Sequence, residues 1–231
     1  LIDCVDPESI FTVADFHKKS IELIDRIHQK NKVPFFVGGS MMYFNSLLKG
    51  LDSLPKRNEA FRLELEKLKK NEGIESLYST LLQKDPLYAA KVKSNDTQRI
   101  IRALEVIKVT GETFTSQTGN IKTNIFSDKF NLHQYAIYEE DRSMLHKSIE
   151  DRLRIIIDNG LLTEVNDLLS NYKIPLDHPI RKAINYKQAI SFINNDYDQK
   201  EFFNKSLYAT RQLAKRQTTW IRSWKDINLF S

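Results

Sequence analysis

The 231-residue chain is 41% hydrophobic and 28% charged, a balance that suits a folded globular protein and excludes a disordered or low-complexity chain. It contains no apolar run of the ~18 residues that a membrane span needs, and its single cysteine, Cys4, excludes an internal disulfide, so we expect a cytoplasmic protein. The net charge of +5 is compatible with a polyanionic partner but does not require one.

The first fifty residues show the pattern of an α/β fold. Thr12-x-x-Asp15 resembles a capping box and precedes a helical apolar period, which predicts a helix over about 13–30. Residues 33–37 form a short continuous apolar run typical of a buried parallel strand. The run ends in Gly38-Gly39-Ser40, and a second helix is expected from Met41 to a stop at Gly50. This order indicates part of a doubly wound sheet.

Residues 56–129 differ in pattern from both of their flanks. From 56 to about Gly111 the only periodicity is helical, and the segment 112–129 is polar enough to be a loop. We therefore expect an α/β core made of 1–55 and 130–231, into which 56–129 is inserted as an all-helical subdomain.

The remainder of the chain returns to a mixture of strands and helices. The run His133–Tyr138 alternates and predicts a strand, and residues 227–230 predict a last one. Four helices are expected, over about 142–158, 161–171, 185–194 and 200–223.

Gly38-Gly39-Ser40, between the predicted strand and helix, is the first candidate site. Glycines let backbone amides approach a ligand, and a helix N-terminus favours anions. Ser40 either caps the helix or bonds a substrate. The spacing is not that of a Walker loop, so a tight turn with an N-cap serine is the alternative interpretation.

A polar helix face is the second candidate. Gln98, Arg99 and Arg102 lie on one side of a helix, whereas Ile100 and Leu104 lie on the other. An amide and two guanidiniums suit a base edge and its phosphates. A solvated helix face is the alternative.

The last long helix is the third candidate. Arg211, Lys215 and Arg222 fall within about 40° of one another on a helical wheel, and Trp220 falls on the opposite, packing side. No carboxylate occurs between residues 201 and 226, so the cations could follow a phosphate backbone. Again a solvated face is the alternative.

Arg152 is a single candidate on the helix predicted over about 142–158, and an ordinary salt bridge is what its local sequence predicts. The five histidines lack the spacing of metal ligands, and no Cys/His or Ser/His arrangement indicates a covalent nucleophile. The sequence therefore predicts no metal site within this chain.

Five blocks follow one another along the chain: Asp3-Cys4-Val5-Asp6-Pro7, Ala14-Asp15-Phe16, Val37-Gly38-Gly39-Ser40-Met41-Met42-Tyr43-Phe44, Asn95-Asp96-Thr97-Gln98-Arg99 and Ala209-Thr210-Arg211-Gln212-Leu213-Ala214-Lys215-Arg216-Gln217-Thr218-Thr219-Trp220. Together they resemble the tRNA dimethylallyltransferase family in order and spacing, over essentially all 231 residues. The resemblance implies a P-loop-type parallel sheet core with an all-helical insertion that embraces the anticodon stem-loop of tRNA.

The resemblance also implies an activity. A dimethylallyl group would pass from dimethylallyl diphosphate to N6 of the adenosine 3′-adjacent to the tRNA anticodon, with Mg²⁺, in a monomeric enzyme. An exocyclic amine is a poor nucleophile, so the protein must neutralise the departing diphosphate and extrude the base.

Individual residues gain implied roles in the same way. Ser40 resembles the hydroxyl residue that contacts the target nucleotide, and Arg152 resembles the arginine that helps to hold the diphosphate. Contacts with tRNA are implied for Ser40, Arg62, Gln98, Arg99, Ile100, Ile101, Arg102, Lys182, Ala183, Ile184, Asn185, Tyr186, Lys187, Lys215, Arg216, Gln217, Thr218, Thr219, Trp220, Ile221 and Arg222.

The sequence departs from the family at several points. Ser40 stands where the family usually has Thr, and Lys182 and Asn185 replace the Arg and Gly of an Arg-x-x-Gly-Tyr motif. The family's phosphate-binding loop, which would supply the main ligands of Mg²⁺, and its general-base aspartate belong ahead of Leu1. We therefore expect this chain to be inactive alone, with Val37 and Ile137 less covered than in a complete core.

Two other functions account for parts of the pattern. A P-loop kinase-like enzyme for small molecules accounts for the α/β elements but not for the basic last helix or the insertion. A non-catalytic RNA-binding module accounts for the basic faces but not for the Gly38-Gly39-Ser40 junction.

Overall fold

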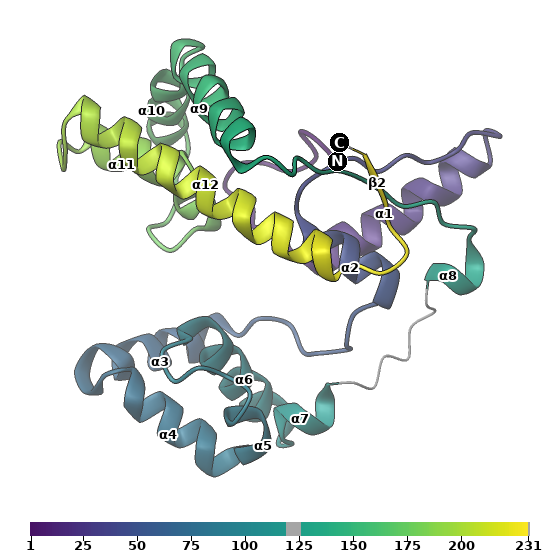
Figure 1. Cartoon of the computed structure of the whole chain (residues 1–231). Helices are drawn as coiled ribbons and strands as arrows, with labels where there is room; N and C mark the ends of the chain where they lie inside the picture. The colour runs from purple at the N-terminus through teal and green to yellow at the C-terminus, as the bar shows by residue number, and fades with distance from the viewer. Residues whose placement is uncertain (119–125, 231) are drawn as a thin grey trace. The chain divides into compact units, whose positions relative to one another are not determined.

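The computed structural model describes residues 1–118 and 126–230, which divide into two compact units (Figure 1). Unit 1 contains Leu1–Asn45 and Asn131–Ser231, and unit 2 contains Ser46–Phe130. Helix α2 (Met41–Lys49) starts in unit 1 and ends in unit 2. Unit 2 therefore begins inside this helix, whereas the sequence pattern changes at residue 56.

Helix α1 (Val13–His28) begins at the predicted capping box. The Asp15 N–H donates to Thr12 Oγ1 at 3.2 Å, and the Thr12 N–H donates to Asp15 Oδ2 at 2.9 Å. The two bonds satisfy backbone donors that a helix start otherwise leaves free.

The run 33–37 is not a strand in this structure, and the prediction of a buried strand is wrong for the described residues. Val33, Phe35 and Val37 are 89%, 81% and 81% exposed, and the backbone of the run pairs with no strand of the described chain. Apolar side chains favour burial, but a strand forms only where a neighbour satisfies its N–H and C=O groups.

A two-stranded parallel sheet forms where two strands were predicted. Strand β1 (Tyr135–Ile137) pairs with β2 (Asn228–Phe230) in the register Tyr135 to Asn228. Ile137 is 90% exposed, so the expected poor cover of Val37 and Ile137 is confirmed. The described chain is mostly helical, with a much smaller sheet than the P-loop-type core that the sequence predicted.

The helices of unit 1 pack around a core of Leu161, Val165, Ala189 and Phe202. Helix α12 packs against α9 and α11, and α10 packs against α9 and α11 (Figure 1). The bounds are α9 (Arg142–Asp158), α10 (Leu161–Asn171), the 3₁₀ helix η1 (Pro179–Lys182), α11 (Tyr186–Ile193) and α12 (Gln199–Ser223).

Unit 2 is entirely helical in its described part, around an apolar core that includes Leu77, Leu81 and Ile100. Residues 112–129, which were predicted as a loop, contain two one-turn helices. The first forms where Thr113 caps its N-terminus and Phe114 is buried. Residues 119–125 of that stretch lie outside the described chain. The bounds are α3 (Glu59–Glu72), α4 (Ile74–Lys84), α5 (Pro86–Ala89), α6 (Thr97–Thr110), α7 (Phe114–Gln117) and α8 (Phe126–Lys129).

Within the described part of the chain, no helix is both long enough and apolar enough to cross a bilayer.

Candidate functional site

The Gly38–Ser40 turn contacts the basic helix α12. Gln217 Nε2 donates to the Gly39 carbonyl at 3.0 Å, across 178 positions of sequence. A Cβ on Gly39 would lie 2.3 Å from Gln217 Nε2, so only glycine permits this close approach without a shift. The fold thus joins two predicted site segments that the sequence alone could not connect.

Ser40 lies at the start of α2, where its carbonyl accepts from the Tyr43 N–H at 2.8 Å. Its side chain is exposed, and its hydroxyl makes no hydrogen bond with the described residues. The N-cap role that was the alternative for this serine is therefore not seen, and the hydroxyl is accessible to a ligand.

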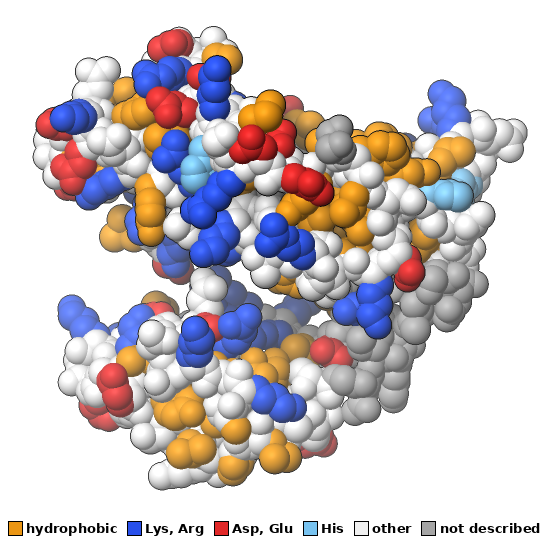
Figure 2. Space-filling view, viewed as in Figure 1, with side chains coloured by type: hydrophobic (Ala, Val, Ile, Leu, Met, Phe, Trp, Pro, Cys, Tyr) orange, Lys and Arg blue, Asp and Glu red, His pale blue; other side chains and the backbone are white. Residues whose placement is uncertain are grey.

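The α12 surface carries exposed cations. Lys215, Arg216 and Arg222 are exposed, and Figure 2 shows Lys and Arg side chains gathered along this helix beside an apolar patch. Arg211 lies 3.6 Å from Glu150 of α9. Partial desolvation and the positive charges of Arg211 and Arg142 lower the pKa of His146.

Arg222 and the two tryptophans anchor the end of α12. Arg222 donates through Nε and Nη2 to Tyr138 Oη at 2.9 and 2.7 Å, directly after strand β1. Trp224 Nε1 donates to Gln134 Oε1 at 2.8 Å. Trp220, expected on a packing side, is 40% exposed, and its ring centroid lies 6.1 Å from that of Trp224. Sequence reasoning missed Tyr138 and Gln134, which no local pattern marks.

Arg152 on α9 is exposed, and it has no ion pair or hydrogen bond with any described residue. The ordinary salt bridge expected from the local sequence is therefore not formed. Its neighbour Arg154 pairs instead with Glu150 at 2.8 Å and lies over the Phe203 ring at 4.6 Å. Arg152 keeps its full donor set for an anionic ligand.

The segment 182–187 contains an unusual backbone conformation at Asn185. Asn185 has φ 71° and ψ −37°, a region that glycine enters freely and that asparagine tolerates better than other residues. Its N–H donates to Gln188 Oε1 at 2.9 Å, and its Oδ1 accepts from Thr210 Oγ1 at 3.3 Å. The side chain of asparagine thus adds a link to α12.

Tyr186, the next residue, donates its hydroxyl to Glu164 of α10. Burial and this carboxylate raise the pKa of Tyr186 to about 12, so the phenol stays protonated as a donor. Lys182, Ala183 and Lys187 are exposed, whereas Ile184 is half-buried.

On α6 of unit 2, Gln98 and Arg99 are exposed as predicted. Arg99 pairs with Asp96 at 2.6 Å, and Asp96 also caps the helix through the Arg99 N–H. Ile100 and Ile101 are buried in the core, so their side chains are not available to a ligand. Any RNA contact of this helix rests on its polar side chains.

Arg62 and Arg102 are less free than the sequence suggested, because both bind the buried carboxylate of Glu105. Sequence reasoning missed Glu105. The signal was a carboxylate three residues after Arg102, the spacing at which two side chains of a helix form an ion pair.

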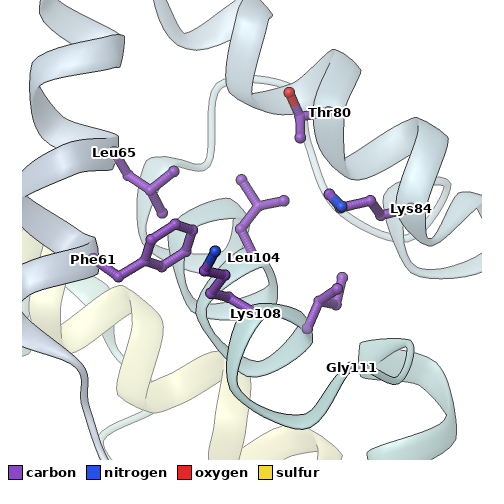
Figure 3. Close-up of a pocket in the computed structure, with 8 residues that line it drawn as sticks. Phe61, Leu65, Thr80, Lys84, Leu104, Lys108 and Gly111 are labelled. Atoms are coloured by element: carbon purple, nitrogen blue, oxygen red, sulfur yellow. The ribbon is translucent and has the colours of Figure 1, made fainter.

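A cavity of about 250 Å³ opens in unit 2 between α3, α4 and α6 (Figure 3). Phe61, Leu65 and Leu104 form its apolar wall, and Lys108 lies 5.8 Å from the Phe61 ring centroid. Lys84 and Thr80 stand on the opposite side (Figure 3). None of the predicted site residues lines this cavity.

The described residues contain no preformed cluster of metal ligands. Among them, no group of three or more His, Cys, Asp or Glu side chains is arranged to hold a metal ion. We therefore assign no Mg²⁺ ligand to this chain.

The chain is similar to one protein family and to several solved structures. The model of the family described as IPP transferase matches residues 1–224. The full-length tRNA isopentenylpyrophosphate transferase of Bacillus halodurans is 30% identical with a TM-score of 0.64, and the match covers 100% of this chain and 70% of that one. The tRNA delta(2)-isopentenylpyrophosphate transferase of Staphylococcus epidermidis is 25% identical with a TM-score of 0.59, with 99% and 73% covered.

A eukaryotic dimethylallyltransferase acting on tRNA shares the fold, with 24% identity and a TM-score of 0.73. That match covers 98% of this chain and 58% of the solved one. The chain thus spans between 58% and 73% of the length of these three solved proteins.

Proposed function

Because the chain belongs to the IPP transferase family, we propose that it serves to transfer a dimethylallyl group from dimethylallyl diphosphate to N6 of the adenosine 3′-adjacent to a tRNA anticodon. The observation that carries the proposal is the hydrogen bond from Gln217 to Gly39. It joins the turn that resembles the target-nucleotide site to the basic helix that resembles a tRNA-binding segment.

The RNA would lie against exposed polar groups. The free hydroxyl of Ser40 suits the target nucleotide, since a hydroxyl both donates and accepts. Lys215 and Arg216 of α12, with Lys182 near η1, suit backbone phosphates of the anticodon stem-loop. On unit 2, Gln98 and Arg99 offer an amide and a guanidinium to the same RNA.

The reaction forms one bond and breaks another. The N6 lone pair attacks the allylic carbon, the carbon–oxygen bond breaks, and diphosphate leaves with its electron pair, while the N6 proton passes to a base or to solvent water. Arg152 carries an uncompensated guanidinium, whose N–H groups would bind the charge that develops on the departing oxygens. We assign no residue of this chain as the base for the N6 proton.

We also propose that residues 1–231 alone do not catalyse the transfer. One arginine does not replace the cradle of backbone amides, lysine and metal that diphosphate chemistry uses. Prenylation of unmodified tRNA by the isolated chain with Mg²⁺ and dimethylallyl diphosphate, detected by mass spectrometry at more than trace rate, would overturn it.

Arg152→Ala tests the catalytic role in a chain that also carries the phosphate-binding loop. We expect kcat to fall by about 10²-fold, with the Kd for the stem-loop within about twofold of the parent, because the guanidinium acts mainly in the transition state. Arg154→Ala is the matched control, since it removes the same charge from the same helix. Unchanged kcat with weaker RNA binding would make Arg152 a positioning residue.

The same assays separate the competing functions. A kinase-like enzyme for small molecules would bind the stem-loop no better than an unrelated hairpin. An RNA-binding module would bind the stem-loop but would transfer no prenyl group, with or without the phosphate-binding loop.

A further inference from the structure

Glu105 is a buried carboxylate that two arginines share. Its side chain is 0% exposed, and it accepts from Arg62 Nε at 2.9 Å, Arg62 Nη2 at 3.1 Å and Arg102 Nη1 at 2.5 Å. The Asn58 backbone N–H donates to it at 2.6 Å, and Arg102 Nη2 donates to the Pro55 carbonyl at 2.8 Å. The carboxylate thus holds both guanidiniums at one point of unit 2.

The cluster has more positive charge than the buried carboxylate needs. One arginine neutralises Glu105, so the second leaves a net charge of one on the group. The side chains of Arg62 and Arg102 remain 26% and 29% exposed. Among the described residues, neither Arg62 Nη1 nor Arg102 Nε has an acceptor, so both guanidiniums keep N–H donors for a ligand.

The arrangement suits a phosphate. Guanidinium groups bind phosphate oxygens through paired N–H donors, and a pair already fixed in place loses little side-chain freedom on binding. Both arginines donate to the same Glu105 oxygen, Oε2, so their guanidiniums lie side by side.

We propose that Glu105 is a positioning residue for RNA binding, which holds Arg62 and Arg102 as a fixed pair that receives a phosphate of the RNA backbone. The inference rests on the proposed function, because RNA is the source of the phosphate. Glu105 itself touches no RNA and acts through the two arginines.

Glu105→Gln in the 231-residue chain tests the role, with binding of an anticodon stem-loop RNA as the readout. The amide keeps the size of the side chain but turns one acceptor into a donor that repels an arginine N–H. We expect the Kd to rise about fivefold to twentyfold. Simple electrostatics predicts the opposite sign, since the variant loses a negative charge and should bind RNA more tightly.

Asp85→Asn is the matched control. Asp85 is also a buried carboxylate of unit 2, but it accepts from Thr115 and the Tyr88 N–H instead of from arginines. We expect the Kd of Asp85→Asn for the stem-loop to stay within about twofold of the parent, even where its thermal stability falls as much as that of Glu105→Gln.

A double-mutant cycle isolates the action through the arginines. In an Arg62→Ala, Arg102→Ala background, Glu105→Gln should change the Kd by less than about twofold. If Glu105→Gln does not fold, Arg62→Lys with Arg102→Lys replaces it, because lysine keeps the charge but cannot make the paired contact. The lysine variant should show a similar loss of affinity.

The outcomes are distinct. Unchanged or tighter binding by Glu105→Gln, an equal loss in Asp85→Asn, or a loss that persists without the arginines would each overturn the positioning role. Failure of the unaltered chain to bind the stem-loop would instead overturn the proposed function, and the RNA partner with it.

Discussion

Asn185 shows how a single backbone angle constrains a residue. At φ 71°, a Cβ is strained for most side chains, and asparagine is among the few that enter this region. Its amide oxygen also accepts from Thr210 Oγ1, which links the start of α11 to α12.

We expect Asn185→Ala to destabilise unit 1 by about 1–2 kcal/mol, because alanine keeps the Cβ strain and loses the hydrogen bond from Thr210. Asn185→Gly should stay within about 1 kcal/mol of the parent, since it relieves the strain. Both tryptophans lie in unit 1, so the urea midpoint of tryptophan fluorescence reports this unit. Asn194→Ala, at an ordinary φ of −79°, is the control; an equal loss there would refute the argument.

Gly39→Ala should break the contact between the turn and α12, because its Cβ would displace Gln217. We expect a loss of about 0.5–1.5 kcal/mol, the size of one hydrogen bond, and Gln217→Ala should lose a similar amount. The double variant Gly39→Ala, Gln217→Ala should lose no more stability than either single variant, as measured by the urea midpoint of tryptophan fluorescence. Gly38→Ala is the control, since its Cβ would make an ordinary 3.7 Å contact with Phe44. Fully additive losses would contradict the coupling.

At the scale of elements, buried carboxylates hold the helices of unit 2 together. Burial raises the pKa of Glu105, but hydrogen bonds from Arg62, the Asn58 backbone and Arg102 outweigh it, so the net pKa is lowered. Burial likewise raises the pKa of Asp85, and bonds from Thr115 and Tyr88 reverse the shift. Glu105 thereby links the start of α3 to α6, and Asp85 links α5 to α7.

Acid should therefore loosen unit 2. A carboxylate whose pKa is lowered by folding stabilises the fold above its unfolded-state pKa of about 4, and this contribution is lost as the pH falls through the folded-state pKa. We expect helical circular dichroism to decline below about pH 4. The double variant Glu105→Gln, Asp85→Asn should show a shallower pH dependence at a lower overall stability. The same pH dependence in both proteins would contradict this account.

At the scale of the whole molecule, both units carry cations that we assign to one RNA. Lys215→Ala in unit 1 and Arg99→Ala in unit 2 should each reduce the slope of log K against log salt by about 0.7–0.9 for the stem-loop, and the two reductions should add. Lys67→Ala is the control, because it removes the same charge from an exposed site on α3 outside the predicted surfaces. An equal reduction in that control would mean that only net charge matters.

The sequence by itself determined the features whose causes are local. Thr12 with Asp15, Asp96 and Asp198 start helices because each side chain bonds a backbone N–H within a few residues. The ordered blocks from Asp3 to Trp220 likewise identified the family, since they are properties of the chain alone.

Only the tertiary structure decided the features that depend on residues far apart in sequence. Residues 33–37 have the apolar composition of a strand, yet no described neighbour supplies the hydrogen bonds that a strand requires. The same holds for the contact of Gln217 with Gly39 and for the capture of Arg62 and Arg102 by Glu105. A helical wheel shows which side of a helix a residue occupies, but the partner and the remaining exposure follow from packing against other helices, which no local pattern encodes.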